Sequence, residues 1–388
     1  IFFLTKKKEE LLSYFNNKIF ILLFIFSLFL IINYLINFNK EPSLTRSLFF
    51  LRFPLYVISF SYLLSQTLLD KNKIFFYWGI ILLIACLDLQ LQNINGKNIL
   101  GYEAVLQGNF FRLGGFMNDE LKIAYFINNF FIITLGYLLI NFEKNKNYIF
   151  YICILTPLVI YSVYLTGERA NFLTLIIVIF LFFAFSKLKK YFFIILFCLI
   201  STLFLFLDKI KESPKFDRML TKNISSIQYL LSKNKGEGFL YKNNVYFNHY
   251  STALQIFQDY PINGVGLKNF RNYCDNPKYD KKISPGQRGK KCATHPHNLY
   301  FEILSELGVI GFLIFFIFFF YIFYIFFSFY FKSKNIFILG NTLTLLMFFI
   351  PFFPRGSFFT NWNAIIFWTV FSINCYLINK YKNKKNYG

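Results

Sequence analysis

The sequence is dominated by apolar runs of roughly twenty residues, the length that a helix needs to cross the hydrocarbon core of a bilayer. We identify ten such runs, at roughly 19–38, 48–69, 74–91, 121–141, 148–166, 169–186, 191–207, 307–331, 335–353 and 362–379. Hydrophobic residues make up 56% of the chain and charged residues 15%, whereas soluble domains contain about 25% charged residues. The composition predicts an all-α polytopic membrane protein and excludes a disordered, collagenous or nucleic-acid-packaging chain, so we expect membrane lipids and no nucleic acid as partners.

Basic residues alternate between the short connecting segments, which predicts the orientation of the runs. One set of short segments holds seventeen Lys and Arg residues, whereas the alternate set (39–47, 92–120, 167–170 and 354–361) holds six. Cytoplasmic loops of membrane proteins accumulate Lys and Arg, so the first set is expected in the cytoplasm. This rule accounts for most of the net charge of +22.

A long connection at 208–306 separates the first seven runs from the last three. The alternation puts this loop outside the cytoplasm, and sixteen basic against nine acidic residues give it a local charge of +7. The excess is either a solvated basic surface or an electrostatic funnel for an anionic ligand. We therefore expect three parts: an N-terminal bundle over 1–207, the outer loop over 208–306, and C-terminal helices with a basic tail over 307–388. Because the sequence opens with Ile1 rather than Met, we expect the true N-terminus, and a further membrane span with it, to lie upstream.

Two of the six cysteines, Cys274 and Cys292, lie in the outer loop, and the others lie within apolar runs. Because an extracytoplasmic compartment is oxidising, a Cys274–Cys292 disulfide is the preferred interpretation. The alternative is a zinc site formed by Cys292, His295 and His297, with Cys274 or His249 as a fourth ligand. Its spacing is uncommon among zinc sites, so we expect no metal.

The segment 294–311 carries the densest set of reactive side chains and leads directly into the eighth run. Pro296 suits the first turn of a helix, so we expect a helix to begin near His295. Three polar residues recur every four positions and would share one face of that helix: Asn298, Glu302 and Glu306.

His295 and His297 flank Pro296 at the expected boundary between water and membrane, in a chain with only three histidines. A neutral imidazole there can accept a proton from a substrate hydroxyl, and a helix start would help to keep it neutral. The alternative is that both histidines are structural.

Arg169 follows Thr166-Gly167-Glu168 where the fifth run turns into the sixth, on the expected outer face. A guanidinium in that place can bind phosphate oxygens in a bidentate manner. Alternatively, Arg169 snorkels to the interface or pairs with Glu168.

Three more arginines lie in outer segments. Arg271 closes the segment 260–271, whose two glycines permit a tight turn but lack the strand–helix context of a dinucleotide site. Arg112 and Arg355 are further candidate anion contacts. By contrast, coupled transport usually needs ionisable groups at the membrane midplane. The runs contain few lone charges, Arg52 and Asp88, and only Asp88 is a candidate for such a group, although it lies toward the end of its run.

Together these motifs resemble the O-antigen ligase family, which shares a domain with the O-antigen polymerases. The resemblance rests on the many spans, on the large outer loop before the last helices, and on four short segments: 116–120, 167–170, 261–271 and 295–302. It implies a GT-C-like fold with a large helical periplasmic loop, in the bacterial inner membrane with the active face periplasmic. It also implies one or two spans upstream of the ten runs, giving eleven or twelve in the full chain. Glu168 departs from the small residue expected between Gly167 and Arg169.

The resemblance implies transfer of a glycan from undecaprenyl diphosphate to lipid A core, without a metal or other cofactor. By motif, His297 would be the base or acceptor-positioning group, and Arg169 and Arg271 would bind the diphosphate. The supporting residues would be His295, Asn298, Glu302, Arg112 and Arg355. Because no divalent ion is expected, fixed guanidiniums would stabilise the leaving diphosphate in an inverting displacement. The alternatives are an O-antigen polymerase, a protein-glycosylating relative, and a transporter or flippase for an anionic lipid or solute.

Overall fold

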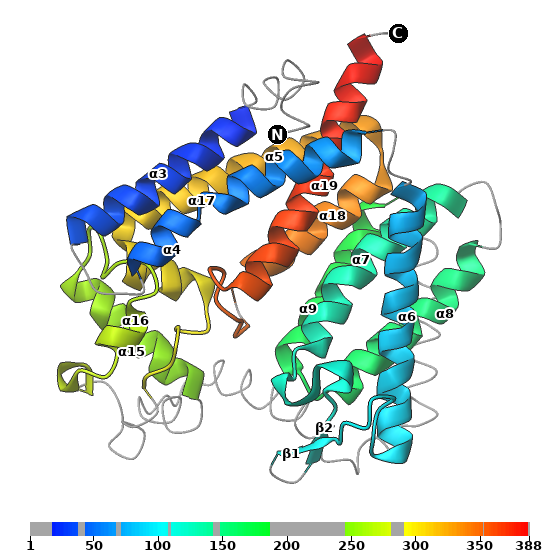
Figure 1. The fold of residues 1–388 in the computed structure, drawn as a ribbon, viewed down its shortest axis with the longest axis horizontal. Coiled ribbons are helices and arrows are strands. Elements are labelled where there is room, and N and C mark those ends of the chain that lie inside the picture. The colour runs from blue at the N-terminus through cyan, green and yellow to red at the C-terminus, as the bar shows by residue number, and fades with distance from the viewer. Residues whose placement is uncertain are drawn as a thin grey trace, which may run out of the picture. The chain divides into compact units, whose positions relative to one another are not determined.

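The computed structural model describes residues 18–37, 43–66, 71–107, 110–142, 148–186, 245–280, 291–351 and 353–386. These residues are mostly helical (Figure 1). The chain forms two compact units, each built from separate stretches of sequence. The first unit contains residues 1–69, 236–329 and 348–388, and the second contains 70–235 and 330–347.

The first unit is assembled around long apolar helices. Its N-terminal part contains α3 (Lys18–Asn37), α4 (Ser43–Phe49) and α5 (Arg52–Ser65). Its later elements are α15 (Val245–Asp259), α16 (Phe270–Tyr273), the 3-10 helix η3 (Pro277–Asp280), most of α17 (Leu299–Ser333), the end of the 3-10 helix η5 (Met347–Phe349), and α19 (Asn361–Asn386). Helix α5 packs along α19, and α3 runs beside α17 (Figure 1).

Aromatic side chains fill the core of the first unit, in a chain that contains 58 phenylalanines. The Phe26 ring lies 5.6 Å from Phe315 between α3 and α17, and Phe53 stacks on Trp368 at 5.8 Å between α5 and α19. Edge-to-face and offset pairs of this kind add about 0.5–1.5 kcal/mol each beyond the area that they bury. The core therefore holds the helices that carry the candidate site.

The described part of the second unit combines five apolar α-helices with a short hairpin. Its elements are α6 (Lys71–Asn95), β1 (Val105–Gln107), β2 (Phe110–Arg112), the 3-10 helix η1 (Gly115–Glu120), α7 (Ile123–Phe142), α8 (Tyr148–Leu165), α9 (Arg169–Phe185) and α18 (Ile336–Leu346). The hairpin is antiparallel, with Val105 opposite Arg112. Helices α7 and α18 pack closely because Gly340 lies against the backbone of α7, where a Cβ would lie 2.9 Å from the Ile132 carbonyl oxygen.

Five described helices are long and apolar enough to cross a membrane: Lys18–Asn37, Ser43–Ser65, Lys73–Asn95, Ile123–Ile140 and Leu299–Ser333. Three shorter apolar helices are Tyr151–Leu165, Arg169–Phe185 and Ile336–Phe349. The expected membrane-protein class is therefore supported, but the count of ten spans is not confirmed. The seventh run, at 191–207, lies outside the described residues. The division at 207 and 306 remains a prediction, because compact units and membrane topology divide a chain differently.

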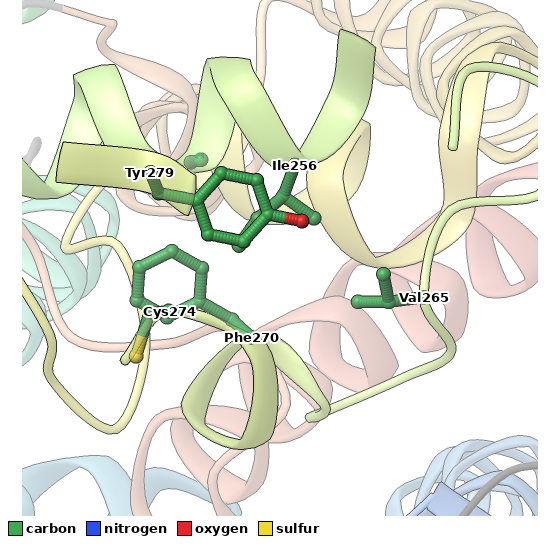
Figure 2. Close-up of a cluster of buried hydrophobic side chains, with 6 residues drawn as sticks. Ile256, Val265, Phe270, Cys274 and Tyr279 are labelled. Carbon is green, nitrogen blue, oxygen red and sulfur yellow. The ribbon is translucent and has the colours of Figure 1, made fainter. Parts of the chain in front are cut away.

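Within the expected outer loop, residues 245–280 and 291–298 pack around a small core. Ile256 from α15, Val265, Phe270, Cys274 and Tyr279 converge in this cluster (Figure 2). The Gln255 side chain on α15 donates to the Tyr279 carbonyl at 3.1 Å. This packing fixes the segment 265–274 against α15, and the same segment contacts α17.

Candidate active site

Helix α17 is interrupted at Gly308, and the segment 261–266 supplies the backbone partners that the helix loses there. On one side of the break, the Val265 and Gly266 N–H groups donate to the Ser305 and Glu306 carbonyls, at 3.0 and 2.8 Å. On the other side, the Val309 N–H donates to the Pro261 carbonyl at 2.8 Å. An interrupted helix is stable in an apolar environment only if its freed backbone groups are bonded in this way. The two sequence motifs therefore form one structural unit.

Two glycines make this close approach of backbones possible. A Cβ on Gly264 would lie 2.4 Å from the Glu306 carbonyl carbon, and one on Gly308 would lie 2.2 Å from the Ile262 carbonyl oxygen. Both glycines also have positive φ, at 66°, which L side chains rarely adopt. The glycines of the 260–271 motif thus serve helix contact as well as the expected tight turn.

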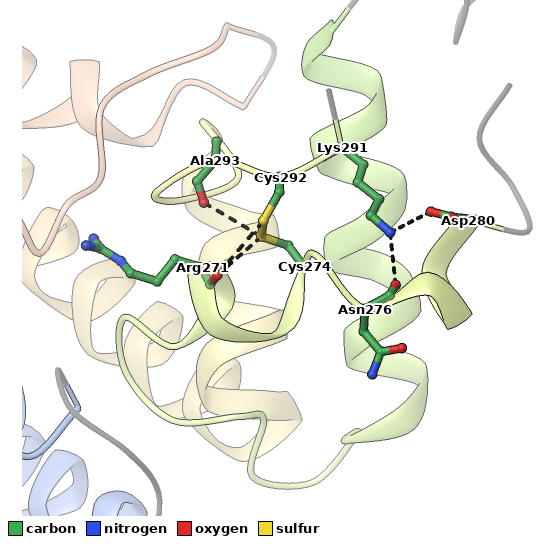
Figure 3. Close-up of a disulfide and its surroundings, with 7 residues drawn as sticks. All are labelled: Arg271, Cys274, Asn276, Asp280, Lys291, Cys292 and Ala293. Carbon is green, nitrogen blue, oxygen red and sulfur yellow. Dashed lines mark hydrogen bonds and ion pairs between the residues drawn. A yellow bond between two sulfur atoms is a disulfide. The ribbon is translucent and has the colours of Figure 1, made fainter. Parts of the chain in front are cut away.

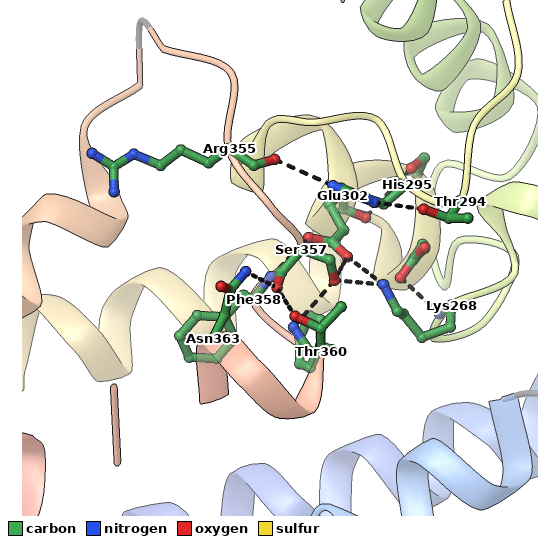
Figure 4. A network of polar contacts seen from close by, with 12 residues as sticks. Lys268, Thr294, His295, Glu302, Arg355, Ser357, Phe358, Thr360 and Asn363 are labelled. Atoms are coloured by element: carbon green, nitrogen blue, oxygen red, sulfur yellow. Dashed lines mark hydrogen bonds and ion pairs between the residues drawn. The ribbon is translucent and has the colours of Figure 1, made fainter. Parts of the chain in front are cut away.

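A buried ion pair joins this segment to α17 and to the loop before α19. Lys268 Nζ lies 3.2 Å from Glu302 Oε1, and the two side chains are 2% and 1% exposed. Ser357 contributes its hydroxyl, which lies 2.5 Å from Lys268 Nζ and donates to Glu302 (Figure 4). A buried charge is tolerated only when it is paired and hydrogen-bonded, so this network fixes three segments relative to one another.

Glu306, one turn after Glu302, also faces the Lys268 segment. Its Oε2 accepts a hydrogen bond from the Lys268 backbone N–H at 2.7 Å. Both carboxyl groups therefore lie on the face of α17 that the sequence pattern predicts, and both contact the same lysine residue. The expectation of a shared polar face is confirmed for Glu302 and Glu306.

The expected start of the helix near His295 is wrong. Helix α17 begins at Leu299, and Asn298 caps it by accepting from the Tyr300 N–H at 2.9 Å. The Asn298 side chain also donates to the Pro351 carbonyl at 2.8 Å, which ties the helix start to the chain before α19. Asn is a strong N-cap residue, so the helix starts after Asn298 rather than at Pro296. Pro296 therefore lies in the preceding turn.

His297 is held in a left-handed backbone conformation immediately before this cap, with φ of 59°. For a residue other than glycine this conformation costs about 1–2 kcal/mol. The Arg355 backbone N–H holds it by donating to the His297 carbonyl at 2.7 Å. Backbone strain of this kind is concentrated at functional sites, because surrounding contacts must maintain it.

The three histidines of the chain meet at this point, although His249 lies on α15, far from the other two in sequence. The His297 ring centroid lies 4.2 Å from His295 and 5.3 Å from His249. Tyr246, also on α15, packs edge-on against His297 at 5.3 Å. The cluster combines the outer-loop helix with the segment before α17.

The two histidines beside Pro296 differ in their contacts. His295 Nε2 lies 3.2 Å from the Arg355 carbonyl oxygen, and Nδ1 lies 3.0 Å from the Thr294 hydroxyl (Figure 4). A carbonyl can only accept, so neutral His295 carries its proton on Nε2 and accepts through Nδ1. Both nitrogens of His295 are therefore engaged, and the Nε2 hydrogen bond links His295 to the loop 353–360. His297 is half-buried and is the stronger candidate for proton transfer.

Burial keeps this pair of histidines neutral. Removal from water lowers the pKa of His295 from 6.5 to about 4, although the nearby Glu302 carboxylate opposes the change. Burial also lowers the pKa of His297, again against the attraction of Glu302. A neutral imidazole at physiological pH can accept a proton, as the sequence argument for His297 requires.

Arg271 and Arg355 belong to the same unit, but their guanidiniums do not take part in the Lys268–Glu302 network. Arg271 is exposed on α16, and its guanidinium points away from the adjacent disulfide (Figure 3). Arg355 contacts both histidines through its backbone, whereas its side chain extends away from them (Figure 4). Arg355 therefore positions the histidine loop through its main chain.

The loop bearing Arg271 is stapled by the disulfide between Cys274 and Cys292, whose Cα atoms lie 5.1 Å apart (Figure 3). Lys291 adds a second link, because its ammonium lies 2.5 Å from Asp280 and donates to the Asn276 carbonyl at 2.9 Å. The zinc alternative required Cys292 as a ligand, and this thiol is bonded to Cys274 in the structure. The segment 281–290 between these links lies outside the described residues.

The second unit contains Arg112 and Arg169. Glu168 forms an ion pair with Arg112, not with Arg169, and the Arg112 Nε donates to the Thr166 carbonyl at 3.5 Å. Gly167 has a φ of 72° and packs against Phe110 of the hairpin. Arg169 opens α9, and among the described residues its guanidinium has no hydrogen-bonding or ionic partner. The alternative in which Arg169 pairs with Glu168 is therefore wrong, and Arg112 is engaged rather than open to an anion.

Comparison with known families assigns the region that contains these motifs. Residues 154–316 match the model of the O-antigen ligase domain. This part of the chain belongs to the O-antigen ligase family. The match contains Arg169, Lys268, Arg271, His297 and Glu302, and members of this family are membrane enzymes of the ligase and polymerase type. No curated protein matches the sequence.

Sequence reasoning missed Lys268 and Ser357 as parts of the site, and it considered His249 only as a possible zinc ligand. Lys268 lay within a recognised motif, but nothing local indicates that this lysine is buried. Ser357 follows the ninth run and meets Glu302 across 55 residues of sequence. The zinc alternative grouped His249 with the other two histidines, and the structure brings the three rings together while Cys292 is bonded to Cys274.

Proposed function

We propose that this O-antigen ligase family protein transfers a glycan from undecaprenyl diphosphate to lipid A core at the periplasmic face of the bacterial inner membrane. The observation that carries the proposal is His297, kept neutral by burial and held in a strained conformation inside the matched domain. The family assignment supports ligase or polymerase chemistry in general. The donor, acceptor and membrane face come from the sequence resemblance and from the alternation of basic segments.

His297 would act as the general base. The acceptor hydroxyl attacks the anomeric carbon of the donor sugar and loses its proton to the imidazole. The new C–O bond forms as the bond to the diphosphate breaks, which inverts the configuration at that carbon. A general base contributes typically 10²–10⁴-fold to such a rate, and a base with a lowered pKa is available over the whole physiological range.

Lys268 and Glu302 would position the base rather than touch the substrate. Their buried network fixes Ser357, and the same loop gives its Arg355 backbone N–H and carbonyl to His297 and His295. The strained geometry of His297 thus depends on a buried ion pair. This arrangement supports a preorganised base, because little reorganisation is needed during the reaction.

Arginines would stabilise the leaving diphosphate, on which negative charge grows as the glycosidic bond breaks. In the first unit, Arg271 is exposed and lies in a loop held by a disulfide and by the core of the outer region. A guanidinium binds phosphate oxygens through two parallel hydrogen bonds, which suits a reaction without a divalent ion. The role in diphosphate binding that the resemblance implies for Arg169 remains a prediction.

The test is glycan attachment to lipopolysaccharide in cells that lack their own ligase. Wild type should restore long-chain lipopolysaccharide, and His297→Ala at an equal membrane level should not. His295→Gln is the matched control, because Gln can keep one hydrogen bond of the loop, so partial activity is expected. Restoration by His297→Ala would remove His297 from the chemistry.

Two other functions predict different outcomes in the same cells. A polymerase would fail to restore attachment even with a matched donor but would lengthen the carrier-linked glycan. A transporter or flippase would tolerate His297→Ala and would move substrate without joining glycans. Analysis of the carrier-linked glycan from the same cells distinguishes these outcomes from the proposed ligase.

A further inference from the structure

Two arginines of the first unit converge on one neutral oxygen near the start of α19. Arg46 Nη1 and Arg52 Nη2 both donate to Asn361 Oδ1, at 3.1 and 2.6 Å. Within the described ranges neither guanidinium has a carboxylate partner. Two cations held together without a counter-ion favour binding of an anion, and the planar fork of arginine suits phosphate.

The pair lies at the head of a mostly apolar groove between α5 and α19. The groove has a volume of about 670 Å³, within the range of small-molecule sites, and is lined by Arg52, Phe53, Tyr56, Asn361, Trp362 and Ile365. A hydrogen bond of 2.8 Å between the Tyr56 and Thr369 hydroxyl groups joins the two helices beside it. Trp362 and Ile365 are exposed, so the groove is accessible along its side. A pair of cations at one end of an apolar groove suits a phosphorylated lipid, whose phosphate would bind the arginines and whose acyl chain would lie in the groove.

The groove is linked to the histidine site by the segment 355–361. The Arg355 backbone contacts His297, Ser357 contacts Glu302, and Asn361 contacts both arginines. Six residues of extended chain span at most roughly 22 Å, so the Cα atom of Asn361 lies within that distance of Arg355. The alternation of basic residues also puts 39–47 and 354–361 on the expected outer face, together with His297.

We propose that this groove, with Arg46 and Arg52 at its head, binds a phosphate and an acyl chain of the acceptor lipid. The inference rests on the proposed function, in which the acceptor is lipid A core, a sugar lipid that carries both phosphates and acyl chains. The donor diphosphate is assigned elsewhere, to Arg271, so the groove serves the second lipid substrate. Its distance from His297 allows one acceptor molecule to reach both places.

The test measures lipid binding to the purified full-length chain in detergent by native mass spectrometry. The probe is bisphosphorylated lipid A, compared with lipid A without phosphates, phosphatidylglycerol and undecaprenyl diphosphate. Arg46→Gln/Arg52→Gln should weaken binding of bisphosphorylated lipid A at least tenfold and leave undecaprenyl diphosphate unchanged. Arg271→Gln should do the reverse.

A second variant separates loss of the site from loss of the fold. Arg52→Lys keeps the charge but removes the planar fork, so it should weaken lipid A binding by an intermediate factor with an unchanged unfolding temperature. Equal binding of lipid A by wild type and the double variant would overturn the inference. So would equally tight binding of phosphatidylglycerol, or preferential loss of undecaprenyl diphosphate in the double variant.

Activity distinguishes this inference from the proposed function. In glycan transfer, the double variant should raise KM for the acceptor at least tenfold while kcat changes less than threefold. An unchanged KM would overturn the inference while leaving the transferase intact. If wild type transfers no glycan, the proposed function fails, and with it the role of the groove as an acceptor site.

Discussion

Replacing Lys268 by Met should destabilise the protein by about 3 kcal/mol, because it leaves the Glu302 carboxylate buried without its cation. Removal of one partner from a buried ion pair costs about 3–5 kcal/mol. Glu302 would keep the Ser357 hydroxyl and the Phe358 N–H, the latter at 3.3 Å, so we expect the lower end of that range. At about 2 °C per kcal/mol for a chain of this size, the unfolding temperature in detergent should fall by about 6 °C.

The matched control for this prediction is Lys278→Met. Lys278 also pairs with a carboxylate, Asp259 at 2.9 Å, but the two side chains are 45% and 42% exposed. Exposed pairs contribute about 0–1 kcal/mol, so the unfolding temperature should change by 2 °C or less. Replacing both members of the buried pair, Lys268→Met with Glu302→Gln, should recover at least half of the loss. Equal stability of Lys268→Met and Lys278→Met would refute the buried-pair argument.

Three further predictions concern backbone, disulfide and pH. Gly308→Ala should lower the free energy of unfolding by about 3 kcal/mol in a chemical unfolding titration, because its Cβ would meet the Ile262 carbonyl. Gly96→Ala is the control, since Gly96 has a positive φ but lies in open space, and it should cost about 1 kcal/mol. Equal costs would contradict the close approach of the two backbones at Gly308. Cys274→Ser should lower the free energy of unfolding by about 3 kcal/mol, because without the disulfide the loop gains conformational freedom in the unfolded state. An unchanged stability of the wild type after reduction would contradict this. The pKa of His295 falls from 6.5 to about 4 on folding, so the unfolded state binds more protons between these two pH values. As pH falls through this window, the wild type should lose about 3 kcal/mol of stability relative to His295→Gln. Parallel stability profiles of the two proteins against pH would refute this prediction.

The class of the protein and the main chemical segments could be predicted from sequence because their signals are local. A run of apolar residues defines a membrane helix by itself, and the segment around His297 carries its reactive groups within a few positions. The start of α17 was misplaced for a local reason too: Pro296 and Asn298 are competing start signals, and the cap formed by Asn298 wins.

The contacts that build the site could not be predicted, because they join residues far apart in sequence. Lys268 meets Glu302 across 34 residues, and Arg112 meets Glu168 from the far side of a helical hairpin. No pattern near Lys268 distinguishes a buried lysine from an exposed one. The break at Gly308 likewise depends on the segment 261–266, whose backbone replaces the missing helix bonds.

The most direct test of the central claim is glycan transfer by the purified protein as a function of pH, from an undecaprenyl-diphosphate-linked glycan to lipid A core. Because burial lowers the pKa of His297 from its ordinary value of 6.5, the wild-type rate should reach half of its plateau at a pH below 6.5. His297→Ala should reduce the plateau at least 100-fold, the lower end of what a general base contributes. A wild-type rate that reaches half of its plateau above pH 6.5, or a His297→Ala rate within threefold of wild type, would contradict the assignment of His297 as the base.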